Sequence, residues 1–305
     1  MKTIYLIIIG FLLTISFSLQ LKSQDDLMDI LDTEVEEEPV VVLATFKSTR
    51  IINGHSIERM VKRQLDFRIN HRFGKLNEGG YALYGLDNAL INFSFEYGIN
   101  DWLMVGLRRG TNKKVYDLST KFSIFRQTKG IKVMPVAISY YVDWSFKTLR
   151  GLDDLPDIRN AKWNEITPRF AYTHQLLIAR KFNEKLSLQL SPSYVHRNLV
   201  KKGDKNDIFA LGFGGRYKFI RRVAFTWEVF YTDHVTKDNV YEYPIALGFD
   251  IETGGHVFQV FFTNSRAMVE DGFLGETTSS WLDGGIYFGF NMSRVFAVGL
   301  GRHKE

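Results

Sequence analysis

In many segments of this sequence apolar and polar residues alternate, and charged side chains recur at the polar positions. Charged groups of this type and spacing could take part in chemistry. Bases and acids that project into one interior could line a hydrated path and select ions. They could instead pair across neighbouring strands and fill a narrow interior, which is the hypothesis that we favour. Because bases outnumber acids, an open path would favour anionic solutes. The candidates are Arg68, Arg72, Glu96, Arg108, Asp117, Lys121, Arg169, Arg216, Lys218 and Glu228.

Acyl chemistry on membrane lipid has less support, because a serine nucleophile needs a histidine base within hydrogen-bond reach. His174 and His196 have no serine two residues away, and no Gly-x-Ser-x-Gly segment occurs. The neighbours His55 and Ser56 would point to opposite faces of an extended segment. We therefore expect no enzyme. Since distant strands could still supply a partner, an outer-membrane lipid-modifying enzyme stays as an alternative.

A metal site is also disfavoured, although His55 and Glu58 would share one face of a helix. Two ligands are too few for a structural or catalytic zinc site. The chain has no cysteine, which removes thiolate sites and disulfides. We expect no metal and no cofactor, and we keep Arg50, His55 and Glu58 as the candidate polar residues of the N-terminal segment.

The elements that must position these side chains are strands with two-residue periodicity. In residues 91–97 the apolar Ile91, Phe93 and Phe95 alternate with polar Asn92 and Ser94. The same alternation returns in 65–73, 103–108, 116–124, 166–173, 186–194, 209–218, 223–232, 243–250, 258–262 and 282–290.

The connections between these segments alternate between short and long. Short turns are expected at 98–101, 126–130, 182–185, 219–222, 252–256 and 291–294, and longer connections at 74–87, 109–114, 143–163, 198–206, 233–242 and 264–280. Such alternation indicates an outer-membrane barrel. Because a membrane offers no water to backbone groups, the sheet must close. We predict an all-β fold, an antiparallel transmembrane β-barrel of about 12 strands (12 to 14), with short periplasmic turns and longer extracellular loops.

A soluble periplasmic lipocalin-like binding barrel is the competing fold, with the aromatic face as its core. The small and mixed-charge residues of the polar face, and aromatics such as Tyr97, Trp102 and Tyr141 at expected strand ends, favour the membrane barrel. The strand number is open at both ends of the chain. Residues 295–300 and 40–50 could each add a strand, giving 14. We expect 12, with residues 40–60 available as a plug.

The N-terminus predicts export. An apolar run from Ile4 to Leu21 follows Lys2 and precedes Ser23, as in a signal peptide; an uncleaved anchor is the alternative. Residues 24–39 contain eight acids and no base. We divide the chain into a cleaved signal peptide (1–23), an acidic flexible arm (24–39), an N-terminal segment that is a plug or an extra strand (40–60) and the β-barrel (61–305). The expected location is the bacterial outer membrane.

Several segments resemble an uncharacterised β-barrel family of Bacteroidota-type envelopes, which is catalogued only as a domain of unknown function. They are residues 45–50, 53–58, 71–74, 85–89, 96–101, 255–259 and 264–266. The resemblance implies an outer-membrane barrel and supplies no activity, substrate or site residue.

The expected function is that of a non-enzymatic outer-membrane barrel, either a structural or interaction barrel or a narrow solute channel with a charged lumen. The net charge is +5, yet Lys and Arg are scattered among aromatics and form no basic stripe, so we expect no nucleic acid partner. The expected partners are outer-membrane lipid, and small anionic solutes or envelope proteins.

Overall fold

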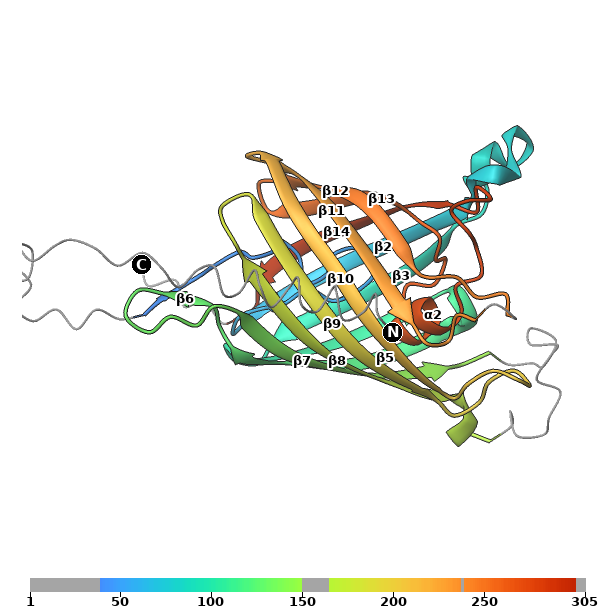
Figure 1. Ribbon diagram of the computed structural model, residues 1–305, viewed down its shortest axis with the longest axis horizontal. Helices are drawn as coiled ribbons and strands as arrows, with labels where there is room; N and C mark the ends of the chain where they lie inside the picture. The colour runs from blue at the N-terminus through green and yellow to red at the C-terminus, as the bar shows by residue number, and fades with distance from the viewer. Residues whose placement is uncertain (1–38, 150–164, 237–238, 300–305) are drawn as a thin grey trace, which may run out of the picture. The chain divides into compact units, whose positions relative to one another are not determined.

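The computed structural model describes residues 39–149, 165–236 and 239–299, in which twelve antiparallel strands close a barrel (Figure 1). Each barrel strand pairs with the next one along the chain, and β14 closes the ring on β2. The strands are β2 (Gln64–Lys75), β3 (Leu90–Gly98), β4 (Leu103–Gly110), β5 (Val115–Phe125), β7 (Ala137–Lys147), β8 (Phe170–Lys181), β9 (Leu186–Arg197), β10 (Asp207–Ile220), β11 (Val223–Thr232), β12 (Ile245–Thr253), β13 (His256–Thr263) and β14 (Tyr287–Ala297).

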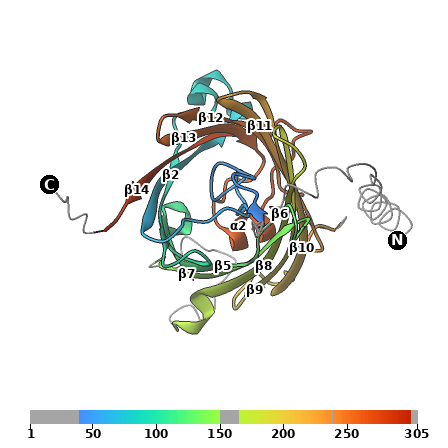
Figure 2. The same ribbon diagram turned by 90° about the vertical axis from the view of Figure 1, so that its left-hand side faces the viewer.

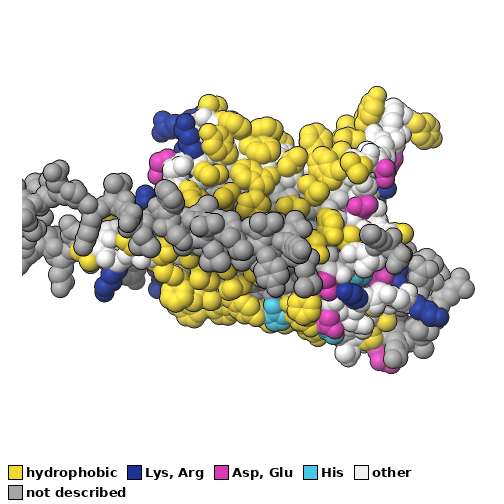
Figure 3. Space-filling view, in the orientation of Figure 1, with side chains coloured by type: hydrophobic (Ala, Val, Ile, Leu, Met, Phe, Trp, Pro, Cys, Tyr) yellow, Lys and Arg dark blue, Asp and Glu magenta, His cyan; other side chains and the backbone are white. Residues whose placement is uncertain are grey.

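Side-chain alternation puts apolar residues on the outside of this barrel. On β3, Phe93 and Phe95 are 41% and 46% exposed, whereas Asn92 and Ser94 between them are buried. Hydrophobic side chains cover the middle of the visible face, and charged ones gather toward its ends (Figure 3). An apolar outer band with a polar interior is the pattern of a transmembrane barrel and the reverse of a lipocalin-like one. The predicted fold class is confirmed, and the soluble alternative is wrong.

The connections at one end are short, as between β10 and β11, except for residues 126–136. Those at the other end are long except between β4 and β5, where only residues 111–114 connect the strands, so the longer connection predicted at 109–114 is wrong. Helix α2 (Glu270–Gly275) lies in the long connection between β13 and β14. The long connections also contain the 3-10 turns η1 (Leu76–Glu78), η2 (Gly80–Gly85), η3 (Asn112–Lys114) and η5 (Thr167–Arg169). Among the described residues, no helix has the length and apolar character needed to cross a membrane.

Two expected turns differ from the structure. The turn predicted at 291–294 does not exist, because β14 runs unbroken from Tyr287 to Ala297. Asn291 and Ser293 are polar because they face the interior. Val295–Ala297 therefore belongs to this twelfth strand and does not form a further strand. The turn predicted at 126–130 extends to 136 and contains β6 (Thr128–Lys129), which pairs with β1 (Val40–Val41) in a small sheet outside the barrel order.

Residues 44–60, here called the inner segment, pass through the ring of strands (Figure 2). They contribute no strand to the closed barrel. A tight turn gives the segment its shape, because Ile51 N donates to Gly54 O at 2.9 Å and Ser56 N donates to Thr49 O at 2.9 Å. Apolar side chains of the inner segment, Phe46 among them, pack against inward residues of the wall.

Glycines on the inner wall leave room for this segment. A Cβ on Gly214 of β10 would lie 2.7 Å from Ile51 Cδ1, closer than side-chain atoms normally approach. The small residues on the polar parity of β10 therefore accommodate the bulk of the inner segment. The predicted signal peptide and the acidic arm, apart from Pro39, lie outside the described residues.

Candidate functional site

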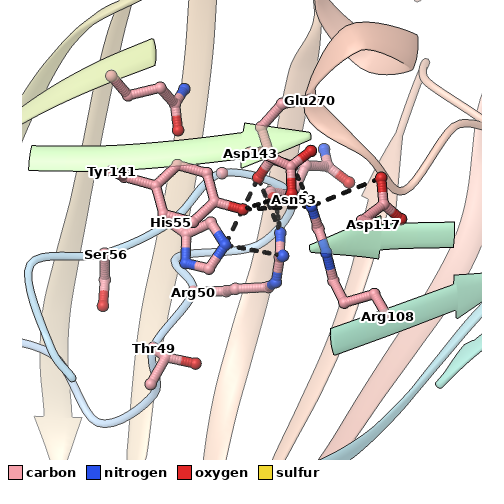
Figure 4. Close-up of polar contacts among 12 residues, drawn as sticks. Thr49, Arg50, Asn53, His55, Ser56, Arg108, Asp117, Tyr141, Asp143 and Glu270 are labelled. Atoms are coloured by element: carbon pink, nitrogen blue, oxygen red, sulfur yellow. Dashed lines mark hydrogen bonds and ion pairs between the residues drawn. The ribbon is translucent and has the colours of Figure 1, made fainter. Parts of the chain in front are cut away.

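A cluster of charged side chains fills the middle of the barrel, and Arg108 of β4 lies at its centre (Figure 4). Arg108 Nη2 lies 2.7 Å from Asp143 Oδ1 on β7 and 2.8 Å from Glu270 Oε2 on α2. Asp117 of β5 is 4.0 Å from the same nitrogen. These four residues, with Arg50 and His55 of the inner segment, are called the lumen cluster, and each is at most 2% exposed.

Helix α2 supplies the carboxylate that connects the wall to the inner segment. All of its residues are buried, and Phe273 and Leu274 pack against inward apolar residues of β9, β10 and β11. Glu270 Oε1 accepts a hydrogen bond from Arg50 Nη1 at 3.2 Å, while its other oxygen binds Arg108. Burial alone would raise the pKa of Glu270, but Arg108 and then Arg50 outweigh it, so the pKa lies below its usual value.

His55 is neutral in this arrangement. Burial is the largest cause that holds the pKa of His55 well below its usual value, and the positive charge of Arg50 is the next. His55 Nε2 therefore accepts a hydrogen bond from Arg50 Nη2 at 2.9 Å. Its distance of 3.7 Å from Glu270 Oε1 is a contact of a neutral ring and not an ion pair.

Glu228 of β11 fixes the tip of the inner segment by accepting backbone N–H groups. Its oxygens accept from Asn53 N at 2.7 Å, Gly54 N at 3.1 Å and Ile52 N at 3.3 Å. Three successive amide groups on one carboxylate make an anion nest in which the ligand is a side chain of the wall. The three amide groups thus partly offset the cost of burying the negative charge of Glu228.

Lys121 of β5 binds the base of the same turn, but as a donor to carbonyl groups where Glu228 is an acceptor. Its ammonium group donates to Glu58 O at 2.7 Å, Ser56 O at 2.9 Å and Thr49 O at 3.3 Å. The three donors of a lysine are all used on backbone carbonyls. The inner segment therefore satisfies its main chain with charged side chains of the wall.

Further wall residues reach the inner segment from other strands. Gln189 Nε2 on β9 donates to His55 O at 2.7 Å, and Gln259 Nε2 on β13 donates to Ile51 O at 2.7 Å. Asn291 Nδ2 on β14 donates to Ile52 O at 3.1 Å. The contacts thus come from several sides of the barrel.

Eight of the ten inward charges predicted from the sequence are buried in the interior. They are Arg68, Arg72, Glu96, Arg108, Asp117, Lys121, Arg216 and Glu228. Arg68 bonds Thr49 Oγ1 of the inner segment at 2.8 Å, and Arg72 bonds Asn53 Oδ1 at 2.7 Å. Arg216 instead pairs with Glu252 at 2.7 Å.

Two predicted residues lie elsewhere. Arg169 lies in η5 and not on the inner face of a strand, because Pro168 has no N–H for the ladder and β8 begins at Phe170. Its guanidinium donates to Leu149 O at 3.3 Å. Lys218 is half-buried near the short-turn end of β10. Neither contributes to the lumen cluster.

Of the three N-terminal candidates, Arg50 and His55 belong to the lumen cluster and Glu58 does not. Glu58 Oε1 accepts from Phe46 N at 3.1 Å, within the inner segment itself. Burial raises the pKa of Glu58 above its usual value.

Sequence reasoning overlooked several acids of the interior. Asp66, Asp143 and Asp250 lie on the inward parity of their strands, so the alternation could have found them. Glu270 gave no such signal, because it lies on a short helix inside a long connection. Tyr141, expected in an aromatic girdle, is fully buried and donates to Asp143 Oδ1 at 3.2 Å. With these acids included, the expected excess of interior bases largely disappears.

The contacts of Glu228 predict that Glu228→Gln loosens the tip of the inner segment. Glutamine keeps one acceptor but turns an NH2 group toward backbone N–H donors, which costs about 1–3 kcal/mol. Hydrogen exchange of the amides of residues 52–54 is expected to accelerate by about tenfold or more. Asp283→Asn removes an exposed acid from a long connection and serves as the control. Unchanged exchange in Glu228→Gln would contradict the role assigned to this carboxylate.

The lowered pKa of His55 predicts weaker docking of the inner segment in acid. Below a pH of about 6.5 the released ring binds a proton that the docked ring does not, so docking loses up to about 1.4 kcal/mol per pH unit. Glu58 acts in the opposite direction because its pKa is raised. His55→Gln isolates the contribution of the ring. Hydrogen-exchange protection of the inner segment is measured for the wild type and for His55→Gln at each pH from 7.5 to 5.5. The protection of the two proteins should converge in acid, and a difference that stays constant with pH would refute the prediction.

Comparison with solved structures finds barrels of low sequence identity. The NanC porin is 11% identical, with a TM-score of 0.47 over 77% of this chain and 100% of that chain. The KdgM porin is 9% identical, with a TM-score of 0.43 over 76% and 99%. The CymD monoaromatic hydrocarbon channel is 7% identical, with a TM-score of 0.37 over 78% and 89%.

Comparison with curated proteins finds no match. The family model described as "Membrane bound beta barrel domain (DUF5777)" matches residues 46–296, which include most of the inner segment and all but the last residue of β14. The match covers most of the chain and agrees with the closed antiparallel barrel and its apolar outer band. The chain therefore belongs to the DUF5777 family of membrane-bound β-barrel domains.

Proposed function

We propose that this protein is a non-enzymatic outer-membrane barrel that is closed to solutes while the inner segment is docked, and that it serves as a structural or interaction barrel. The observation that carries the proposal is the ring of contacts around the inner segment. Wall side chains from β2, β5, β9, β11, β13 and β14 bond to it, on strands distributed around the barrel.

The pairing of interior charges supports a closed barrel over a selective pore. A selectivity lining leaves charges free to meet a passing ion. Here Arg108 is shared by Asp143 and Glu270, and Glu228 is used by three backbone amides. Such charges are committed to holding the inner segment and α2 in place.

The lipid-facing histidines support a role without catalysis. His196 Nδ1 lies 2.8 Å from Asp207 Oδ1, which also accepts from Tyr194 OH at 2.6 Å. His174 Nδ1 lies 2.7 Å from Tyr140 OH. No serine or threonine hydroxyl is bonded to either ring in the part of the chain that the structure describes, so neither has the nucleophile that acyl transfer needs.

The apolar band and the predicted signal peptide together support export to the outer membrane. In this proposal residues 1–23 are removed, the short turns face the periplasm and the long connections face outward. Outer-membrane lipid contacts the band that includes Phe93, Leu107 and Phe213. Envelope proteins would meet the long connections.

A narrow solute channel is the second candidate, and the chemistry of the wall favours it. Side-chain atoms of Asn92, Ser94, Ser139 and Thr173 are buried without a hydrogen-bond partner among the described residues. Polar groups of this kind suit a hydrated path that opens when the inner segment moves. This candidate requires release of the segment, because the docked segment occupies the interior.

Conductance of the purified protein in a planar bilayer separates the two candidates. The wild type should show no steady conductance, because the inner segment fills the barrel. A variant that lacks residues 44–57 should conduct, and Arg108→Glu in that background should shift its ion selectivity toward cations. A heat-modifiable gel shift verifies that each variant forms a barrel. Steady wild-type conductance whose selectivity Arg108→Glu alters would overturn the closed barrel in favour of the channel.

A further inference from the structure

A cavity of about 360 Å³ lies among the long connections of the barrel. The ends of β7 and β9, the start of β14 and the connections 198–206 and 264–286 contribute to its lining. No residue of the inner segment lines it. Five basic and two acidic side chains do, so the cavity has a surplus of positive charge.

Two of the three lysines of the lining, Lys113 and Lys147, are already paired with acids. Glu276 Oε2 lies 2.5 Å from Lys113 Nζ, and Glu276 Oε1 lies 3.5 Å from Lys147 Nζ. Asp271 Oδ2 lies 3.0 Å from Lys147 Nζ as well. Although burial opposes it, the pair of lysines lowers the pKa of Glu276 to about 2, so this carboxylate stays charged. The two arginines of the lining, Arg197 and Arg266, take no part in these ion pairs.

Arg197 is the more deeply buried of these two arginines. Its side chain is on the inward parity of β9 and is 3% exposed. Its nitrogens donate to two backbone carbonyls, Gly275 O at 3.1 Å and Lys205 O at 2.8 Å. Nε is buried and has no partner, and the guanidinium forms no ion pair with any carboxylate that the structure describes. A buried guanidinium that has no carboxylate in contact is costly, and an anion in the cavity would supply a partner.

Arg266 lies shortly before α2 in the sequence and has similar contacts, although its side chain is only half-buried. Arg266 Nη2 donates to the amide oxygen of Asn88 at 2.6 Å, and its Nε is buried without a partner. It too forms no ion pair within the described ranges. Two guanidinium groups held by neutral acceptors thus line one cavity, and guanidinium groups suit the paired oxygens of carboxylates and phosphates.

We propose that this cavity binds the oxyanion group of a small, polar solute of about monosaccharide size, such as a sugar acid or a sugar phosphate. Its volume lies at the lower end of the range for ligand pockets, about 300–1,000 Å³. Arg197 receives the oxyanion, and the Tyr241 and Tyr287 rings of the lining offer apolar faces to a sugar ring. The site is independent of conduction, because the inner segment takes no part in it.

A phosphorylated lipid headgroup shares this oxyanion chemistry, but the lining favours a soluble ligand. Arg197 projects into the barrel and away from the lipid-facing side, and residues that flank α2 bound the cavity. A lipid would have to bring its headgroup over the rim of the barrel. The experiment therefore includes both sources.

Isothermal titration of the full mature protein in neutral detergent tests the proposal. Glucuronate and glucose 6-phosphate should each bind saturably with a Kd of about 1 mM or tighter, whereas glucose should not bind. Arg197→Gln should weaken binding by about tenfold or more, because it removes a charged hydrogen-bond donor. Arg197→Lys keeps the charge and should retain part of the affinity.

Two further variants keep the test decisive. Arg266→Gln should also weaken binding and covers the case in which Arg197→Gln fails to fold, as judged by the heat-modifiable gel shift. Lys202→Gln removes a neighbouring charge that does not line the cavity and should leave the affinity unchanged. The proposal is overturned if neither sugar anion binds, if Lys202→Gln weakens binding as much as the arginine variants, or if only vesicles that contain a phosphorylated lipid bind.

Discussion

The structure depends on one constraint: charges buried inside a membrane barrel need partners. Arg108 is 1% exposed at the centre of the interior, where removal of one member of a buried ion pair costs about 3–5 kcal/mol. Asp143 on the wall and Glu270 on α2 share its charge. Because Glu270 also binds Arg50, the same cluster fixes the wall, a helix from a long connection and a segment from the N-terminal side of the barrel.

The inner segment meets the complementary requirement for its backbone. A chain without regular secondary structure, buried away from water, must find partners for its N–H and C=O groups. Glu228 accepts three amides and Lys121 donates to three carbonyls, so two charged wall residues serve six main-chain groups. The inward charges of the strands thereby bind the inner segment. This accounts for the large number of charged residues inside a narrow barrel.

The two-residue alternation of apolar and polar residues predicts most of the fold. It located the strands and put Arg72, Lys121 and Glu228 inside, because the parity of a strand residue fixes the side to which it points. The same rule could have identified Asp143 and the inward Tyr141, whose neighbours Tyr140 and Val142 blurred the assignment of the two faces. At the C-terminal end, interior Asn291 and Ser293 resembled a turn, since polar residues inside a barrel and in a loop are chemically alike.

The lumen cluster could not be assembled from the sequence. Arg50 and Glu270 are 220 positions apart, and neither lies on a strand, so no periodicity links them. Arg50 and His55 were selected as polar residues of a segment that could plug the barrel, yet their partners depend on how α2 folds inward. Phe273 and Leu274 determine how α2 folds inward, because they pack on β9, β10 and β11. A local sequence pattern does not indicate such a long-range contact.

The most direct test of the account is the accessibility of Ser56, which is fully buried in the inner segment. Since the chain has no cysteine, Ser56→Cys gives a single thiol in an otherwise native protein. The account predicts that a membrane-impermeant, water-soluble thiol reagent labels this residue in purified outer membranes far more slowly than a thiol placed at the exposed Asp283, and that Glu228→Gln accelerates the labelling. Equally fast labelling at both positions would contradict a barrel closed by its inner segment.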